Sequence, residues 1–296
     1  MVRMESMTFG YGKRPLFEGL DLRLEPGAIH GLLGLNGAGK TSLLKIAAGA
    51  LRPERGIVEV YGRAPRRREA AALADVCFVP EDPFFPALKP AVWVERYAAF
   101  RPAFERGRFD ELFAELGLDA DKPISKFSYG QRKKFALAAA VASGARLLLL
   151  DEPTNGLDIP SKAQLRRVLA AASGPDRVVV VSTHQIRDLE LLLDPIIVID
   201  RGRVAFTVTM AELSDRLGTA RLPSLEGLPV VYAERDAVGW TALLATSGVE
   251  EAAPPDLELV FDAAVAAPAR LAAALRGDAL PEYRPDEAAL AAGGRA

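Results

Sequence analysis

The chain has 296 residues, of which 50% are hydrophobic and 26% charged, and its formal net charge at pH 7 is −2. These values are ordinary for a globular protein with one large domain, or with one large and one small domain. The charge balance gives no electrostatic reason to expect nucleic acid as a partner. With one cysteine and two histidines, the chain can form neither an internal disulfide nor a Cys/His metal cluster.

Neither the start of the chain nor its most apolar segment predicts a targeting or membrane-spanning element. Residues 1–6 lack the apolar core of a signal peptide. The most apolar segment, 135–150, is interrupted by Ser143, Gly144 and Arg146, so it cannot span a bilayer by itself. We therefore expect a cytosolic chain, for which any membrane role needs a partner.

Residues 34–41 read GLNGAGKT and fit the phosphate-binding pattern G-x-x-x-x-G-K-[ST] at every fixed position. The preceding segment, 28–33, predicts a buried strand, and the following segment, 42–48, predicts a helix. Glycines let consecutive backbone N–H groups turn toward phosphates, Lys40 adds a positive charge, and the Thr41 hydroxyl can bind Mg²⁺. The sequence therefore predicts a site for a nucleoside triphosphate with Mg²⁺. The residues expected to form it are Gly34, Asn36, Gly37, Ala38, Gly39, Lys40, Thr41 and Ser42.

Short strands are predicted after this helix, and they end with the apolar run at 76–79. Cys77 lies within that run, and we interpret it as a small buried hydrophobe rather than a reactive thiol. The basic run at 63–68 is interpreted as a solvated loop or helix start. Contact with phospholipid or with a partner is the alternative for this run.

Residues from 82 to about 143 predict an aromatic-rich helical segment. Eight aromatic residues recur there at loose helical spacing, and we expect them to form a small core of their own rather than a ligand site. They are Phe84, Phe85, Trp93, Tyr97, Phe100, Phe104, Phe109 and Phe113.

The segment 146–152 reads as an apolar strand that ends in two carboxylates, Asp151 and Glu152. An aspartate at this place can hold Mg²⁺, directly or through water, as the partner of a phosphate loop. The glutamate one residue later is placed to orient and deprotonate an attacking water. Further apolar segments at 177–182 and 195–200 predict buried strands, which gives a mainly parallel sheet with helices on both faces.

A short motif lies between the two nucleotide-binding segments, at residues 127–131, which read FSYGQ. It resembles the signature LSGGQ of the ATP-binding cassette (ABC) ATPases. Ser128, Gly130 and Gln131 match that signature, whereas Phe127 and Tyr129 differ from it. The resemblance extends over about residues 3–207. It implies an α/β fold of the P-loop NTPase (RecA-like) class, with an antiparallel β subdomain and a helical insertion.

The resemblance also assigns expected roles to single residues. Tyr11 matches the aromatic that stacks on adenine, with a surface tyrosine at a strand end as the alternative. Residues 155–158 resemble the loop that crosses to a second subunit, which makes Asp158 a nucleotide-site residue. His184 resembles the switch histidine and would bind the γ-phosphate, so that the expected catalytic pair is Glu152 and His184.

One position departs from the family pattern, because Glu81 stands where a glutamine is usual. The glutamine contacts Mg²⁺ and lies at the hinge to the helical insertion. Glu81 keeps an oxygen ligand and adds a charge, so the expected Mg²⁺ ligands are Thr41, Glu81 and Asp151. The expected cofactors are ATP and Mg²⁺.

The resemblance implies residues 1–209 as the nucleotide-binding domain, with its helical subdomain at about 82–143. After it we expect an accessory α+β domain at 210–296, with a poorly ordered tail from about residue 281. No motif assigns a function to this region. Packing and dimer support is the simpler interpretation, and regulation by a ligand or partner is the alternative.

The resemblance implies a head-to-tail pair of cassettes, with ATP between the phosphate loop of one subunit and the signature residues Ser128, Gly130 and Gln131 of the other. One cassette per chain predicts a homodimer, or a heterodimer with a sister cassette. The expected function is that of the ATPase subunit of an ABC transporter, of the bacterial export type, on the inner face of the cell membrane. It would touch the membrane only through a separate permease. The alternatives are an ABC ATPase without a transport role, for example in cluster assembly, and a degenerate cassette with poor hydrolysis.

Overall fold

A six-stranded sheet forms the centre of the computed structural model, which describes residues 1–12, 14–235, 237–246 and 252–283. Its strand order is β5-β6-β7-β3-β8-β9, and only β9 runs antiparallel to its neighbour. The strands are β3 (Ile29–Leu33), β5 (Val76–Val79), β6 (Leu147–Asp151), β7 (Val178–Thr183), β8 (Ile196–Asp200) and β9 (Arg203–Val208). The predicted mainly parallel sheet is confirmed. Because β3, β6 and β7 are parallel neighbours, their carboxyl ends meet at one edge.

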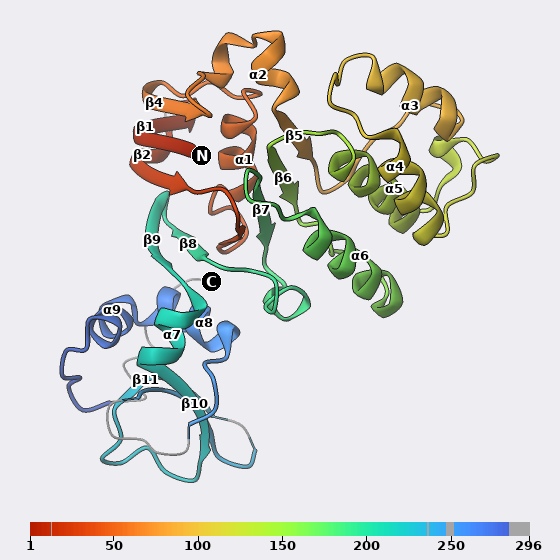
Figure 1. Cartoon of the computed structure of the whole chain (residues 1–296). Coiled ribbons are helices and arrows are strands. Elements are labelled where there is room, and N and C mark those ends of the chain that lie inside the picture. Colours follow the sequence, from red (N-terminus) through yellow and green to blue (C-terminus); the bar gives the residue numbers. More distant parts are fainter. Residues whose placement is uncertain (13, 236, 247–251, 284–296) are drawn as a thin grey trace.

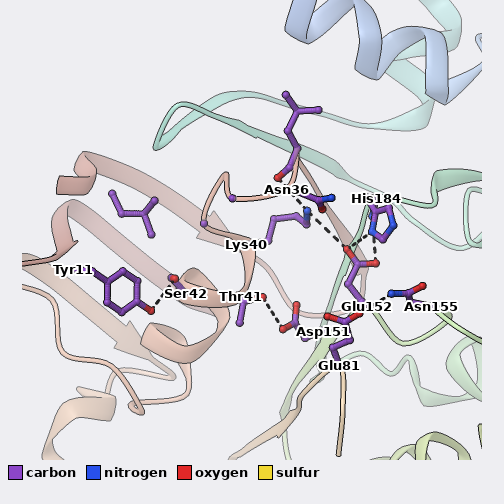
Figure 2. Close-up of a pocket in the computed structure, with 14 residues that line it drawn as sticks. Tyr11, Asn36, Lys40, Thr41, Ser42, Glu81, Asp151, Glu152, Asn155 and His184 are labelled. Carbon is purple, nitrogen blue, oxygen red and sulfur yellow. Dashed lines mark hydrogen bonds and ion pairs between the residues drawn. The ribbon is translucent and has the colours of Figure 1, made fainter. Parts of the chain in front are cut away.

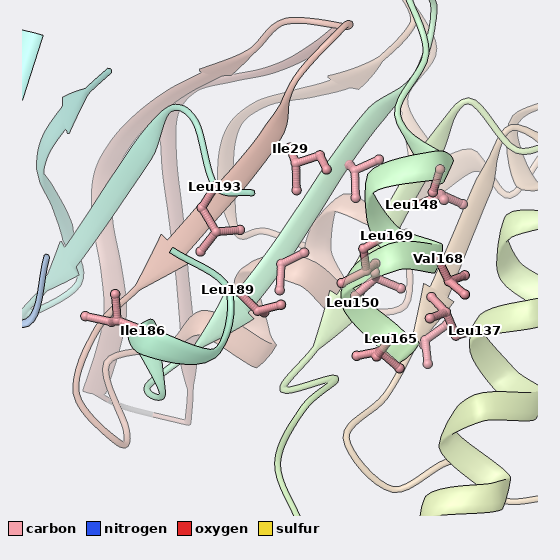
Figure 3. Close-up of a cluster of buried hydrophobic side chains, with 14 of the residues drawn as sticks. Ile29, Leu137, Leu148, Leu150, Leu165, Val168, Leu169, Ile186, Leu189 and Leu193 are labelled. Carbon is pink, nitrogen blue, oxygen red and sulfur yellow. The ribbon is translucent and has the colours of Figure 1, made fainter. Parts of the chain in front are cut away.

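The two faces of this sheet are buried by different layers. Successive side chains of a strand point to opposite faces, and those of β6 accordingly divide between two hydrophobic clusters. One face is covered by α1 (Lys40–Ala47) and by an antiparallel sheet in the order β2-β1-β4. The other is covered by α5 (Tyr129–Val141) and α6 (Ile159–Ala172). Figure 3 shows Leu148 and Leu150 of β6 facing the apolar side of α6.

The antiparallel sheet and its neighbours complete the first face (Figure 1). It consists of β1 (Val2–Tyr11), β2 (Arg14–Leu24) and β4 (Arg55–Val60). The basic run predicted as a loop or helix start includes the short 3₁₀ helix η1 (Pro65–Arg67), which precedes α2 (Ala70–Ala74). Cys77 is buried, in agreement with its interpretation as a small hydrophobe.

The helical insertion contains α3 (Pro90–Ala98), α4 (Arg106–Glu115), η2 (Ile124–Lys126) and the start of α5. Its aromatic rings gather around Phe135 of α5, with ring centroids 5.0 Å from Phe85 and 5.7 Å from Phe109. The expectation of a separate aromatic core is wrong, because α5 joins these rings to the same cluster as β6. Two of the predicted members, Phe84 and Phe100, are 90% and 81% exposed and pack into no core.

The C-terminal region is α+β, as expected, and lies at the far end of β9 from the antiparallel sheet (Figure 1). It contains α7 (Met210–Arg216), β10 (Leu217–Leu222), β11 (Val230–Arg235), β12 (Trp240–Ala245), α8 (Leu257–Ala266) and α9 (Pro268–Arg276). An ion pair of 2.6 Å between Arg187, in the 3₁₀ helix η3 (Ile186–Asp188), and Glu258 of α8 joins it to the segment after β7.

The tail expected from residue 281 begins with described residues and continues outside them. Tyr283 accepts a hydrogen bond of 3.1 Å from the backbone N–H of Ala233, which attaches this point of the chain to β11. Residues 284–296 lie outside the described residues. Within the described part of the chain, no helix has the length and apolar character needed to cross a bilayer.

Candidate nucleotide-binding site

A cavity of about 610 Å³ opens at the edge of the sheet where β3, β6 and β7 end. It collects residues from segments that lie far apart in the sequence (Figure 2). The lining residues are Tyr11, Leu16, Leu35, Asn36, Gly37, Gly39, Lys40, Thr41, Ser42, Glu81, Asp151, Glu152, Asn155 and His184.

The loop between β3 and α1 needs its glycines for steric reasons. A Cβ on Gly34 would lie 2.8 Å from the carbonyl oxygen of Ile199. Gly39 is the N-cap of α1 with φ of 105°, and a Cβ there would lie 2.6 Å from the Phe17 ring. A side chain at either position would therefore displace the loop. Because α1 begins here, its unpaired N–H groups and positive dipole end point toward the cavity and favour an anion.

Lys40 lies folded over this loop and is buried. Its Nζ donates to the carbonyl oxygen of Gly34 at 2.7 Å and lies 3.8 Å from Oε1 of Glu152. Burial lowers the pKa of Lys40, while the carboxylates of Glu152, Asp151 and Glu81 oppose that shift. The lysine charge is thus held at the centre of the cavity, among acceptors that a phosphate group can replace.

Asp151 is fixed by hydroxyl groups on both sides. Thr41 Oγ1 donates to Asp151 Oδ2 at 2.8 Å, and Ser182 Oγ donates to Asp151 Oδ1 at 2.6 Å. The β6–β7 register places Asp151 directly opposite Ser182. Mg²⁺ prefers oxygen ligands, and the Thr41 hydroxyl and the Asp151 carboxylate already lie within hydrogen-bonding distance of each other. The residues present therefore fit this ion.

Glu152 adopts a left-handed backbone conformation with φ of 45°, and its side chain is buried at the cavity wall. Its N–H donates to the carbonyl oxygen of Ser182 at 3.0 Å. His184 Nδ1 lies 2.8 Å from Oε1 of Glu152, and the His184 backbone N–H donates to Oε2 at 3.4 Å. These bonds aim the carboxylate at the region between Lys40 and His184 (Figure 2).

Glu81 enters the cavity from the segment after β5 and is bound to other loops. Asn155 Nδ2 donates to Glu81 Oε1 at 2.6 Å, and Tyr129 Oη donates to the Glu81 carbonyl oxygen at 3.1 Å. Gln185 Nε2 donates in turn to Asn155 Oδ1 at 3.3 Å. The segment after β5 is therefore joined to the loop after β6 and to the loop after β7.

Tyr11 lies at the mouth of the cavity and is 61% exposed. Its hydroxyl lies 3.1 Å from Ser42 Oγ, and its ring meets Phe9 edge to face with centroids 5.0 Å apart. The exposed ring face is available to a flat ligand, and Leu16 adds an apolar side chain to the cavity lining.

The remaining predicted site residues lie outside this cavity. Ser128 caps α5: its Oγ accepts from the N–H of Gln131, and the Gln131 side chain accepts from the N–H of Ser128. Asp158 caps α6 by accepting from the N–H of Ser161 at 2.9 Å. Within one chain, the structure does not bring Ser128, Gly130, Gln131 or Asp158 to the cavity that holds Lys40.

Sequence reasoning missed several residues of the cavity. Leu16 and Leu35 line it without belonging to a chemical pattern, and Asn155 contributes through its side-chain amide. Ser182 could have been found, because a hydroxyl at a strand end in register with Asp151 has a carboxylate as its natural partner.

A phosphate loop after β3, a carboxylate pair after β6 and a helical insertion between them define the class of ATP-binding cassette ATPases. The model of the ABC transporter family matches residues 17–155. The Daunorubicin resistance ATP-binding protein DrrA3 of Streptomyces coeruleorubidus is 32% identical over 247 residues, which cover 81% of this chain and 76% of that protein. The chain belongs to the ABC transporter ATP-binding proteins.

Two further comparisons agree with this assignment. The Nod factor export ATP-binding protein I of Paraburkholderia xenovorans is 31% identical over 208 residues, or 68% of each chain. A solved ATP-binding subunit of an ABC transporter superposes with a TM-score of 0.67 at 23% identity, covering 72% of this chain and 91% of that one. The fold expected from the FSYGQ resemblance is confirmed, and the chain is an ATP-binding ATPase of the ABC transporter family.

Proposed function

We propose that this chain is the ATP-hydrolysing subunit of an exporter and that it drives a separate membrane permease. The observation that carries this proposal is the meeting of Lys40, Thr41, Asp151, Glu152 and His184 in one cavity. The export part of the proposal is supported by relatives that are described as a daunorubicin resistance protein, a Nod factor export protein and a bacitracin transport protein.

ATP would lie with its base against Tyr11 and its phosphates over the start of α1. The backbone N–H groups of residues 36–42 and the Lys40 ammonium would bind the phosphate oxygens. Thr41, Asp151 and Glu81 would hold Mg²⁺, which neutralises phosphate charge when it is bound. Of these three, Glu81 accepts a hydrogen bond from Asn155 through one carboxylate oxygen, Oε1.

Hydrolysis would use Glu152 as the general base. Its carboxylate accepts a proton from a water molecule as the water oxygen bonds to the γ-phosphorus and the bond from that phosphorus to the ADP oxygen breaks. His184 bonds both carboxylate oxygens of Glu152 through its ring and its backbone N–H, so it fixes the direction of the base. Because Nδ1 donates to the carboxylate, a hydrogen bond from Nε2 to a γ-phosphate oxygen requires the doubly protonated imidazolium.

The proposed site is completed by a second cassette. Gly130 and Gln131 lie in the first turn of α5, which Ser128 caps, outside the Lys40 cavity; the helix N–H groups there can bind a phosphate of another subunit. Asp158 begins α6 on the loop that follows Glu152. A head-to-tail dimer of identical or sister cassettes would place these residues on the partner's ATP.

The proposed permease surface lies on the helical insertion. Phe84 is 90% exposed and follows Glu81 by three residues, so an apolar contact is adjacent to a residue of the nucleotide cavity. A permease bound here would hold the chain at the inner face of the membrane. Residues 1–209 would form the nucleotide-binding domain, with the helical subdomain at about 82–143, and residues 210–296 the accessory domain.

The test is a pull-down of the tagged Glu152→Gln variant, with ATP, from detergent-solubilised cells. Stoichiometric recovery of a polytopic membrane protein would support the transporter subunit. Recovery of soluble partners alone, with the bait absent from the membrane fraction, would favour an ABC ATPase without a transport role. The Lys40→Ala variant is the control, because it should not hold ATP and should lose any ATP-dependent partner.

A further inference from the structure

Lys133 is a buried lysine outside the nucleotide cavity, on α5, and only 3% of its surface is exposed. Its Nζ donates to the carbonyl oxygen of Glu152 at 2.6 Å and to the carbonyl oxygen of Asn155 at 2.8 Å. It lies 5.0 Å from the ring centroid of Tyr129, one turn earlier on the same helix. The ammonium is thus placed between the first turn of α5 and the loop that follows β6.

Burial of this cation is unfavourable unless nearby groups compensate for it. Burial lowers the pKa of Lys133 to about 8, and the carboxylates of Glu81, Glu152 and Asp151 oppose that shift. A lysine without partners inside the protein could extend its long side chain and keep its ammonium group in water. The cost of burial is instead offset by two short bonds, both to the loop that carries Glu152.

That loop has a backbone that needs support. Glu152 has φ of 45°, a left-handed conformation that is unfavourable for a residue with a Cβ. Its N–H is held by the Ser182 carbonyl, and its own carbonyl is held by Lys133. Four residues later, Gly156 has φ of 73°, and a Cβ there would lie 2.8 Å from the Tyr129 ring. Lys133 and Tyr129, one turn apart on α5, therefore lie against the two ends of this loop.

We propose that Lys133 is a positioning residue for hydrolysis: it holds the carbonyls of Glu152 and Asn155 and so fixes the direction of the Glu152 carboxylate. Tyr129 supports this contact by packing against the Lys133 ammonium and by bonding the Glu81 carbonyl. The inference rests on the proposed role of Glu152 as general base. Lys133 itself does not line the nucleotide cavity.

The Lys133→Met variant distinguishes a positioning role of Lys133 from a purely structural one. Methionine fills a volume similar to that of the lysine stem, but it leaves the carbonyl oxygens of Glu152 and Asn155 without their donor, so some loss of stability is expected in either case. If Lys133 positions Glu152, the Lys133→Met variant loses turnover while its fold is retained. If Lys133 only fills space, the variant keeps turnover.

The experiment measures steady-state ATPase and thermal unfolding of the full chain with Mg²⁺, for the wild type and for Lys133→Met. We expect kcat to fall on the order of 100-fold, as a misplacement of about 1 Å can cause, with KM for ATP within about threefold. The control is Lys126→Met, which removes an exposed lysine of η2 and should keep both constants. A wild-type kcat for Lys133→Met, or a rise in KM that accounts for the whole loss, would overturn the inference.

A double-mutant comparison separates positioning from general damage. In the Glu152→Gln background, Lys133→Met should lower the residual single-turnover rate by less than about threefold, because two residues that act together do not give additive losses. A further loss of about 100-fold there would show that Lys133 acts elsewhere. If Lys133→Met does not fold, Lys133→Arg, which keeps a charged donor but moves it, is measured by the same comparison.

These measurements also separate this inference from the proposed function. Wild-type turnover in Glu152→Gln would contradict the general-base role itself. An inactive Glu152→Gln with a fully active Lys133→Met would overturn only the role of Lys133.

Discussion

Gly39→Ala tests the steric argument for the phosphate loop. Gly39 has φ of 105°, and the new Cβ would lie 2.6 Å from Cζ and 2.8 Å from Cε1 of Phe17. The left-handed backbone costs about 1–2 kcal/mol in a residue with a Cβ, and forcing a methyl group into a packed site costs about 1–3 kcal/mol more. Because Phe17 is fully buried in the core, the loop is the part that can move.

The movement should appear in ATP affinity more than in global stability. A loop displaced to avoid about 2 kcal/mol of overlap would bind ATP about 30-fold more weakly, since each 1.4 kcal/mol corresponds to tenfold. The assay is a titration with a fluorescent ATP analogue, together with urea unfolding. Phe17→Leu in the same chain should recover part of the affinity, because the smaller side chain frees the space that the methyl group needs.

The matched control is Gly62→Ala. Gly62 also has a positive φ, 75°, but a Cβ there would meet no atom within 4 Å, and the residue lies outside the cavity. It should lower the free energy of unfolding by about 1 kcal/mol and leave ATP affinity unchanged. Wild-type ATP affinity in Gly39→Ala would refute the argument that Phe17 fixes the loop.

Three further predictions concern Glu152, Glu81 and Asp262. Glu152→Gln should form dimers in MgATP by light scattering, and a variant that stays monomeric would count against the head-to-tail pair. Glu81→Gln should keep most of the ATPase activity, because an amide oxygen can replace the carboxylate; complete loss of turnover would show that the charge is required. Burial and the nearby carboxylates of Glu234, Glu258 and Asp256 raise the pKa of Asp262 to about 6. The folded chain therefore takes up a proton more readily than the unfolded chain, and stability falls as the pH rises from about 4 to above 6. Asp262→Asn should stabilise the chain at pH 7 by about 1 kcal/mol, after a discount for partial exposure, and by less at pH 4, as measured by urea unfolding at both values.

The sequence predicted those parts of the site whose chemistry is contiguous in the chain. Lys40 and Thr41 belong to one short pattern, and Asp151 and Glu152 end an apolar run that predicts a strand. Because the first segment follows β3 and the second ends β6, and β3 and β6 are parallel strands of one sheet, their meeting at one edge follows from the fold. These residues now share one cavity, while the roles assigned to them stay predictions.

Features that depend on the packing of distant segments could not be predicted in this way. Helical spacing predicted Phe84, Phe100 and Phe109 alike as core residues, although the first two are exposed and the third is only 3% exposed. Lys133 reads as one of several basic residues after the signature, and only the fold places its ammonium against the Glu152 carbonyl. Burial of a charge leaves no local pattern in a sequence.

The charges of the cavity lead to a last prediction, about Mg²⁺. Around Lys40 the cavity gathers the carboxylates of Glu81, Asp151 and Glu152, so the protein presents more negative than positive charge to an anionic triphosphate. At an effective dielectric constant of about 20, two unit charges 4 Å apart repel by about 4 kcal/mol, so ATP alone should bind poorly to this arrangement. Removal of Mg²⁺ with EDTA should therefore weaken ATP binding by tenfold or more, because about 1.4 kcal/mol of that repulsion already corresponds to a factor of ten in affinity. Asp151→Asn should recover part of the metal-free affinity while abolishing hydrolysis, because it removes repulsion together with the Mg²⁺ ligand. Equal ATP affinity of the wild type with and without Mg²⁺ would mean that Lys40 and the α1 N–H groups outweigh the three carboxylates by themselves.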